Sequence, residues 1–395
     1  MARHKGFLTG GKKPLSNTGK DNTKICPPGE GERKGRISMN VSQLGSGMTR
    51  EEAAANGMVI AFHASENPDK PAIISEAGNR TYGELNAKAN QLVRALRRAG
   101  LKAGDAVALL CSNRPEFVET VVACQRGGFR MTPVNWHLTG KEVGYIVDNC
   151  EAIDGFVLYD DAINAEEDSN IDDPVLGTQM MYTSGTTGHP KGVFRREAAP
   201  VSPLLVKLTE TAAFKPGDVA LVTGPLYHAA PLALNLNFPI NAGIGCVIMD
   251  KWDAEETLRL VQKHRITHTH VVPTMLHRIL SLDEATRTKY DFSSLRWILH
   301  GAAPCPTHVK ERSINMFGPV VFEYYAATEG GGIFVDSHEW KAKPGSVGKP
   351  LPGVVVRIIN DNGDEAKPDE VGTGYFQAPE QGRFEYFKAP EKTAS

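Results

Sequence analysis

The residues with the clearest chemical potential form the run 182–193, Tyr-Thr-Ser-Gly-Thr-Thr-Gly-His-Pro-Lys-Gly-Val. Its first seven positions are all Gly, Ser, Thr or Tyr, which predicts a flexible loop rich in hydroxyl and backbone N–H donors suited to phosphate oxygens. Lys191 places a positive charge against them. The run is not a Walker A loop, because Gly185 and Gly188 lead to Pro190 and Val193 instead of Gly-Lys-Ser/Thr. A phosphate-binding loop outside the P-loop NTPases is predicted, with an ordinary surface connection as the alternative.

A second group of reactive side chains follows the apolar run 320–322. Residues 323–329 read Glu-Tyr-Tyr-Ala-Ala-Thr-Glu, the pattern of a strand that ends in a functional loop. The alternative is an ordinary strand end that carries a surface acidic residue.

Two shorter segments could line a ligand site. Gly301-Ala-Ala-Pro304 follows an expected strand at 297–300, although the same residues also occur in ordinary strand-to-turn connections. His228 ends the run Pro225-Leu-Tyr-His and lies among apolar neighbours, which is also typical of a histidine satisfied in a protein core.

Metal sites built from clustered ligands are not expected. In a strand over 267–272 only His268 and His270 would share a face, and no Cys or carboxylate follows closely to complete a site with His264. The acidic stretch 159–173 lacks the spacing and the Gly of a calcium loop, so a solvated linker is expected there.

Composition indicates a globular protein of two or three subdomains. The chain has 395 residues, of which 41% are hydrophobic and 23% charged. The first 39 residues carry nine Lys or Arg against three Asp or Glu, so the remainder has a net charge of about −8. Such a body is not expected to bind nucleic acid.

The cysteines and the hydropathy pattern favour a cytoplasmic location. The six Cys residues are scattered without a C-x-x-C pair, which argues against structural zinc and a disulfide framework. No apolar run approaches the roughly 20 residues that span a bilayer, and no signal peptide is evident at the N-terminus.

The order of elements predicts an α/β fold of layered, mostly parallel sheets with helices, plus a small β subdomain near the C-terminal end. Residues 1–47 are expected to be a disordered basic tail, 48–344 the α/β core and 345–395 the β subdomain. Thr81 and Glu84 form a capping box for a helix that closes at Gly100. A further helix is expected at 115–126. Strands are expected at 106–110, 131–134, 219–222, 245–249, 269–272, 297–300, 354–359 and 374–377.

Taken together and in this order, the motifs resemble those of the AMP-forming adenylating enzymes, and most closely bacterial fatty-acyl-CoA synthetases. The likeness covers about Met48 to Ser395, including Gly345-Ser-Val-Gly-Lys-Pro350, and Ala326 stands where the family usually has Gly. It implies that Tyr325 lies against adenine, Thr328 bonds the α-phosphate and Glu329 ligates Mg²⁺. The nucleotide-binding residues that it implies are Thr183, Ser184, Gly185, Thr186, Thr187, Gly188, Lys191, Gly301, Ala302, Ala303, Glu323, Tyr324, Tyr325, Ala326 and Thr328.

The resemblance also implies an activity, an acid–thiol ligation with ATP, Mg²⁺ and CoA. A carboxylic acid, expected to be a fatty acid, would form an acyl-adenylate that CoA then cleaves, with Thr183, Lys191, His228, Thr328 and Glu329 as catalytic residues. A homodimer is left open. An amino-acid adenylation domain is less favoured, because no acidic anchor for an α-amino group is evident.

Two departures from the family pattern qualify this expectation. The chain stops before the Thr-Gly-Asp segment, hinge and small C-terminal domain of relatives, and the passage 150–160 is shorter than usual, as after an internal deletion. We therefore expect impaired thioester synthesis, and the alternative is a non-catalytic nucleotide- or acyl-binding fragment.

Overall fold

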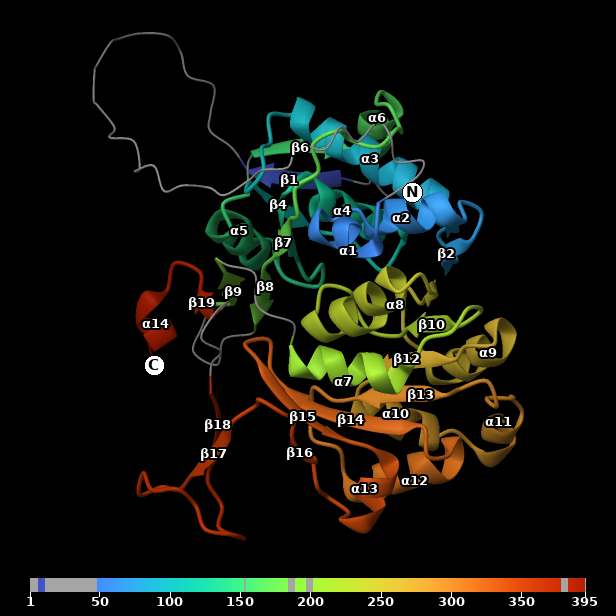
Figure 1. Cartoon of the computed structure of the whole chain (residues 1–395), viewed down its shortest axis with the longest axis vertical. Helices are drawn as coiled ribbons and strands as arrows, with labels where there is room; N and C mark the ends of the chain where they lie inside the picture. Colours follow the sequence, from blue (N-terminus) through green and yellow to red (C-terminus); the bar gives the residue numbers. More distant parts are fainter. Residues whose placement is uncertain are drawn as a thin grey trace.

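Two large β-sheets organise the chain (Figure 1). One is built from the N-terminal half, and the other from the C-terminal half together with two strands from residues 71–81. The computed structural model describes residues 6–10, 48–152, 154–183, 189–196, 202–377 and 383–394. Helices cover both sheets, and most neighbouring strands in them are parallel. The predicted α/β class with layered, mostly parallel sheets is therefore confirmed.

The first sheet has five strands in the order β6-β1-β4-β5-β7. Its parallel part comprises β4 (Ala106–Leu109), β5 (Arg130–Pro133) and β7 (Thr178–Gln179). Strand β1 (Gly6–Gly10) is antiparallel to both β4 and β6 (Asp154–Leu158). Residues 6–10 therefore form a strand, whereas disorder was expected for residues 1–47. Pairing with β4 and β6 satisfies backbone N–H and C=O groups that this segment could not satisfy alone.

The helices of the N-terminal half form the layer between the two sheets and a cover on the outer face. Helix α3 (Tyr82–Arg98) begins at the predicted capping box, with Thr81 as N-cap, and buries its apolar stripe against α4 (Pro115–Gly127) and both sheets. Helices α1 (Arg50–Ala55), α2 (Val59–Glu66) and α6 (Tyr159–Asn164) pack around them. Helix α5 (Gly140–Asn149) covers the opposite face of the five-stranded sheet through Ile146.

The second sheet has nine strands in the order β16-β15-β14-β13-β12-β10-β11-β2-β3. The six strands from β14 to β2 are parallel, and the edge strands are antiparallel. The predicted strands of this sheet are confirmed to within about a residue at most ends. Their bounds are β16 Lys349–Pro350, β15 Gly331–Val335, β14 Val321–Ala326, β13 Trp297–His300, β12 His268–Val271, β10 Val219–Val222, β11 Gly245–Ile248, β2 Pro71–Ser75 and β3 Arg80–Thr81.

Each face of this sheet buries its own helices. One face packs against α9 (Ala254–His264), α10 (Pro273–Leu280), α12 (Thr307–Phe317) and α13 (Ser337–Ala342), and α11 (Glu284–Thr288) contacts α9. The other face carries α7 (Pro203–Ala212), a π-helical segment η2 (Pro231–Asn237) and α8 (Phe238–Asn241). No helix among the described residues is long and apolar enough to cross a bilayer.

The β-rich run after Gly345 contributes to three sheets. Strand β16 extends the nine-stranded sheet, whereas β17 (Val356–Ile359) and β18 (Thr373–Phe376) form a hairpin that projects from the body (Figure 1). A turn follows β17, with Gly363 at φ 87°. Strand β19 (Phe384–Tyr386), followed by α14 (Pro390–Ala394), joins β9 (Lys191–Arg195) and β8 (Met181–Thr183) in a three-stranded sheet.

Candidate active site

The predicted phosphate loop is carried by the antiparallel hairpin of β8 and β9. Thr183 at the end of β8 pairs with Lys191 at the start of β9, and its hydroxyl donates to the Lys191 carbonyl oxygen at 3.5 Å. The hairpin therefore fixes the two ends of the loop opposite each other. The predicted loop residues Ser184, Gly185, Thr186, Thr187 and Gly188 lie outside the described residues.

Helix α5 holds both ends of this loop from the side. Tyr182 donates its hydroxyl to Oδ1 of Asn149 at 2.5 Å. In the segment that leads into β9, the ring of His189 stacks on that of Tyr145, with ring centroids 4.5 Å apart and planes at 23°. One helix thus anchors the residue before Thr183 and the residue two before Lys191.

The third strand of this sheet brings Tyr386 against the hairpin. Tyr386 pairs with Val193, so its side chain lies on the same face of β9 as Lys191 and Arg195. The Lys191 ammonium lies 4.9 Å from the centroid of the Tyr386 ring. The Tyr386 hydroxyl donates to Oε1 of Glu329 at 2.9 Å. Lys191 and Glu329, predicted from two separate motifs, therefore meet at one tyrosine.

The strand β19 is held in place on its other side by aromatic and ionic contacts. The guanidinium of Arg130 faces two aromatic rings that contact each other, 5.5 Å from the Phe194 ring and 4.8 Å from the Phe387 ring. Lys388 forms an ion pair of 2.9 Å with Glu151. These contacts join β19 to the five-stranded sheet and so fix the position of Tyr386.

The turn that carries Thr328 and Glu329 links β14 to β15. Reciprocal backbone hydrogen bonds between Ala327 and Gly330 close it, and Gly330 has a φ of 158°. The side chain of Arg195 reaches across from β9, and Nη2 donates to the carbonyl oxygens of Thr328 at 3.3 Å and Glu329 at 2.8 Å. Burial lowers the pKa of Arg195, and the Glu329 charge opposes this shift. Arg195 thus links the β8–β9 hairpin to the turn that carries Thr328 and Glu329.

Side chains alternate between the two faces of β14, so Tyr324 and Tyr325 point in opposite directions. The Tyr325 ring is 51% exposed and stacks on Phe376 of β18, with centroids 5.8 Å apart and planes at 27°. Tyr324 points inward, and its hydroxyl is 3.1 Å from Nε2 of His270. Tyr325 is therefore the aromatic ring of this motif that a ligand could reach, and Ala326 beside it is half-buried.

Glu323 differs from the expectation that it contacts a nucleotide. Its carboxylate is buried and forms a 2.5 Å hydrogen bond and ion pair with Lys310 of α12. Burial lowers the pKa of Lys310, and the Glu323 carboxylate opposes that shift. A buried carboxylate needs such a partner, so the side chains of Glu323 and Tyr324 both support the sheet beneath the site.

The small-residue segment after β13 packs directly on Tyr324. A Cβ added to Gly301 would lie 2.5 Å from Cε1 of that ring, so glycine is required by close approach. Ala302 and Ala303 are exposed, and Ala302 has a φ of 64°, a conformation that a residue with a Cβ adopts at a cost. This arrangement presents main chain and small side chains, as a flat ligand would require.

His228 belongs to a separate aromatic group. Its ring lies 4.7 Å from that of Tyr227, which in turn is 6.5 Å from His137, and His137 stacks on Trp136 at 3.6 Å. The residue is exposed, yet nearby protein atoms desolvate its ring and lower the pKa of His228. The π-helical η2 begins three residues later, a distortion often found at functional sites.

The other predicted histidines are engaged in the fold. His268 and His270 share one face of β12, where His268 Nε2 is 2.8 Å from the Ala212 carbonyl oxygen. Burial lowers the pKa of His270 to about 4. Within the described ranges, no group of three His, Cys, Asp or Glu residues could hold a metal ion. A cation at this site would therefore rely on one carboxylate, that of Glu329, together with ligands from substrate and water.

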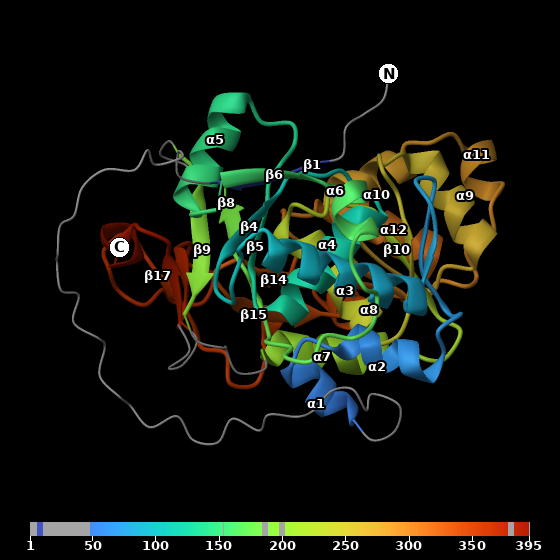
Figure 2. The same ribbon diagram turned by 90° about the horizontal axis from the view of Figure 1, so that it is seen from above.

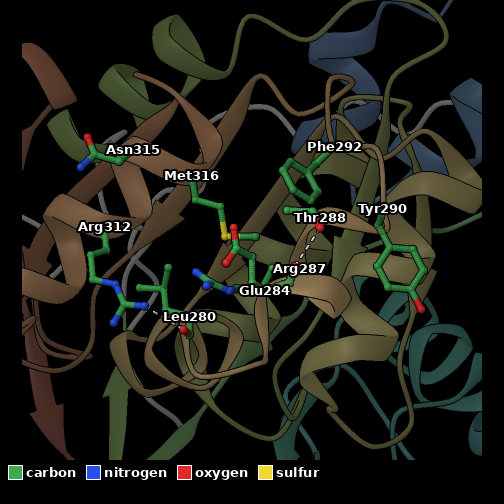
Figure 3. A pocket seen from close by; sticks show the side chains of 9 residues that line it. All are labelled: Leu280, Glu284, Arg287, Thr288, Tyr290, Phe292, Arg312, Asn315 and Met316. Carbon is green, nitrogen blue, oxygen red and sulfur yellow. Dashed lines mark hydrogen bonds between the residues drawn. The ribbon is translucent and has the colours of Figure 1, made fainter.

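A surface hollow of about 570 Å³ lies away from all these residues. It is formed by α10, α11, α12 and the segment after α11, and is lined by Leu280, Glu284, Arg287, Thr288, Tyr290, Phe292, Arg312, Asn315 and Met316 (Figure 3). In Figure 2 these helices lie at the opposite end of the molecule from β9 and β17. None of the predicted site residues lines the hollow, so we place the candidate site at the Lys191–Tyr386–Glu329 junction.

Sequence reasoning missed Arg195 and Tyr386. A signal for Arg195 was available, because residues 191, 193 and 195 of a strand share one face. The sequence contains no such signal for Tyr386, because its role depends on the pairing of β19 with the distant strand β9.

Comparisons with known proteins identify the family of the chain. The profile of the family described as AMP-binding enzyme matches residues 60–175 and 157–381. The fatty acid–[acyl-carrier-protein] ligase ScoC from Streptomyces coeruleorubidus is 30% identical, covering 84% of this chain and 70% of its own length. The indoleacetate–CoA ligase from Aromatoleum aromaticum is 28% identical, covering 80% and 69%.

A solved structure shows the same architecture. The o-succinylbenzoate CoA synthetase (MenE) from Bacillus subtilis, in complex with the acyl-adenylate intermediate OSB-AMP, superimposes with a TM-score of 0.71. It is 25% identical, and the match covers 83% of this chain and 70% of that one. On the family profile and these relatives, the chain belongs to the AMP-binding enzyme family.

Proposed function

We propose that this chain activates a carboxylic acid with ATP and transfers the acyl group to a thiol, as an AMP-forming acid–thiol ligase. The observation that carries the proposal is the meeting of Lys191 and Glu329 at Tyr386. It brings the cation of the β8–β9 hairpin and a carboxylate from the turn between β14 and β15 into one place. The names of the relatives as CoA or acyl-carrier-protein ligases support this reaction class.

In the first step, a carboxylate oxygen attacks the α-phosphorus of ATP, the bond to the β-phosphate oxygen breaks, and pyrophosphate leaves with that electron pair. The chain's contribution is positioning and charge stabilisation. Lys191 would neutralise phosphate charge, and the hydroxyls of Thr183 and Thr328 would donate to phosphate oxygens. Arg195 would hold Thr328 in place through the backbone of its turn.

Glu329 fits the role of a magnesium ligand. Its carboxylate is half-buried, Oε1 is engaged by Tyr386, and among the described residues none donates a hydrogen bond to Oε2. Mg²⁺ is commonly held by one or two carboxylates, with phosphates and water as the other ligands. When bound, the ion would neutralise the charge of the phosphates.

For the nucleotide base, we propose the surface formed by Tyr325 and the segment Gly301–Ala303. The exposed ring of Tyr325 offers a stacking face, and the small residues leave room for a flat base. Tyr325 already stacks on Phe376, so a base would have to share or replace this contact.

In the second step, a thiol sulfur attacks the carbonyl carbon of the acyl-adenylate, a thioester forms and AMP leaves. We propose CoA as the thiol substrate, and His228 as the residue that faces the acyl and thiol groups. Its lowered pKa keeps the imidazole neutral at pH 7, where it can accept a proton from the thiol.

For the acid, we propose a fatty acid. The fatty acid–acyl-carrier-protein ligase among the relatives favours this choice, whereas the indoleacetate and o-succinylbenzoate ligases show that aromatic acids are used within the same family. The acid panel in the experiment below must therefore contain both classes.

The test is acid-dependent exchange of labelled pyrophosphate into ATP, with Mg²⁺ present. The panel should run from butyrate to palmitate, with indoleacetate, ferulate and benzoate as aromatic members. We expect exchange with at least one chain length of fatty acid, and addition of CoA then measures thioester formation as a separate step. Exchange with aromatic acids alone would overturn the choice of acid. Absence of exchange with every acid would contradict the proposed reaction.

A further inference from the structure

Tyr386 contacts both charged groups of the candidate site at once. Its ring faces the Lys191 ammonium at 4.9 Å, and its hydroxyl donates to Glu329 at 2.9 Å. Lys191 begins strand β9 of the three-stranded sheet, whereas Glu329 lies in the turn between β14 and β15, and no ion pair between them is present among the described residues. One aromatic residue thus separates two opposite charges that would otherwise attract each other across the site.

The surroundings keep Tyr386 in this position. Its backbone pairs with Val193 of β9, and its N–H donates to the hydroxyl of Thr393 in α14 at 2.9 Å. Because an ionised carboxylate only accepts hydrogen bonds, the phenol hydroxyl is the donor of this pair.

We propose that Tyr386 is a positioning residue of the adenylation site, whose hydroxyl orients the Glu329 carboxylate for Mg²⁺ and whose ring holds Lys191 towards the phosphates. This inference rests on the proposed function. The hydroxyl occupies Oε1, so Oε2 is the oxygen presented to a cation. Hydrogen-bonding partners of ligating carboxylates fix their orientation, and their removal typically weakens metal binding by about 10- to 100-fold.

The ring has a second and separable role. A cation over an aromatic face is attracted by the ring quadrupole, and this attraction does not require the hydroxyl. Tyr386→Phe would therefore keep the ring contact with Lys191 and lose only the bond to Glu329. Tyr386→Leu would lose both and leave Lys191 able to turn towards the Glu329 carboxylate.

The experiment is a titration with Mn²⁺ as a paramagnetic substitute for Mg²⁺, in the presence of α,β-methylene-ATP. Its Pα–CH₂–Pβ linkage prevents the loss of pyrophosphate, so this nucleotide cannot donate an adenylyl group. Free Mn²⁺ is measured by electron paramagnetic resonance, so the readout does not depend on catalysis. Tyr290→Phe is the matched control, because Tyr290 also donates to a glutamate, Glu255, at 2.7 Å. Tyr290 follows α11, which lies at the opposite end of the molecule from β9 (Figure 2).

We expect Tyr386→Phe to bind Mn²⁺ about tenfold more weakly than wild type, and Tyr290→Phe to bind it unchanged. At saturating Mn²⁺, Tyr386→Phe should bind the nucleotide like wild type, whereas Tyr386→Leu should bind it more weakly. Unchanged or tighter Mn²⁺ binding by a folded Tyr386→Phe variant would overturn the role of Tyr386 and leave the proposed function intact. A wild-type chain that binds no metal–nucleotide complex would contradict the proposed function itself.

Discussion

The hydroxyl of Tyr386 donates a 2.9 Å hydrogen bond to Glu329, from a residue 57 positions further along the chain. Tyr386 ends strand β19, Glu329 lies in the turn between β14 and β15, and the same tyrosine ring faces Lys191 in a third part of the sequence. The site therefore depends on the docking of β19 onto β9 as much as on the motifs themselves.

Removal of the Lys191 charge should impair the first step. We expect Lys191→Ala to lower the rate of acid-dependent pyrophosphate exchange by about 100-fold, as loss of one electrostatic contact to a reacting group does in other enzymes. The matched control is Lys263→Ala, an exposed lysine on α9. Equal losses in the two variants would show that Lys191 does not act on the phosphates.

Arg195 should affect nucleotide binding through the turn that it holds. Arg195→Met removes the donors to the Thr328 and Glu329 carbonyl oxygens, so the KM for ATP should rise by about tenfold or more. The neighbouring Arg196 is exposed and pairs with Glu385 instead, which makes Arg196→Met the control. If steady-state kinetics give Arg195→Met the same KM for ATP as Arg196→Met and wild type, Arg195 does not support nucleotide binding.

Gly301 should be intolerant of any side chain. In Gly301→Ala the new Cβ would overlap the Tyr324 ring, and such overpacking typically costs about 1–3 kcal/mol of unfolding free energy. Denaturant unfolding would measure this loss. Gly140→Ala is the control, because nothing lies within 4 Å of its added Cβ and the residue is in a helix. A Gly301→Ala protein as stable as wild type would show that the Tyr324 ring can move.

Acidification should destabilise the fold through its buried histidines. Burial lowers the pKa of His270 from 6.5 to about 4, and burial together with the charges of Lys310 and His270 lowers that of His300. The folded state then binds fewer protons than the unfolded chain, so the unfolding free energy is intact above pH 6.5 and falls between pH 6.5 and 4. One such proton changes it by at most about 1.4 kcal/mol per pH unit.

His270→Gln should flatten this pH dependence. Denaturant unfolding at pH 7.5, 6 and 5 would show a smaller loss for the variant than for wild type. His308→Gln on the surface of α12 is the control and should follow the wild-type curve. The same slope in His270→Gln and wild type would mean that other groups cause the acid sensitivity.

The sequence predicted the strands of the large sheet well, because strands buried on both faces read as short apolar runs between helical patterns. The capping box also predicted the start of α3, because Thr81 and Glu84 are only three residues apart in the sequence. Lys191, Thr328 and Glu329 could be proposed as site residues because each lies in a contiguous motif. Each of these signals lies within a few neighbouring residues.

Features that depend on distant pairing were not predictable in this way. Strand β1 is a Gly-rich segment without a strand pattern, and its place between β4 and β6 follows from the edges available to it. Glu323 was expected at the nucleotide, but its burial beside Lys310 is visible only once α12 is packed on the sheet. Tyr386 was missed because nothing near it in sequence indicates Glu329 as its partner.

The most direct test of the account follows the oxygen atoms of the acid. The chain is supplied with ATP, Mg²⁺, CoA and a carboxylic acid labelled with ¹⁸O in both carboxylate oxygens, and the products are analysed by mass spectrometry. Attack on the α-phosphorus predicts one ¹⁸O atom in AMP, because the bridging oxygen stays with the phosphate when the acyl group is transferred. Label in inorganic phosphate or pyrophosphate, or AMP formed without label, would contradict adenylation.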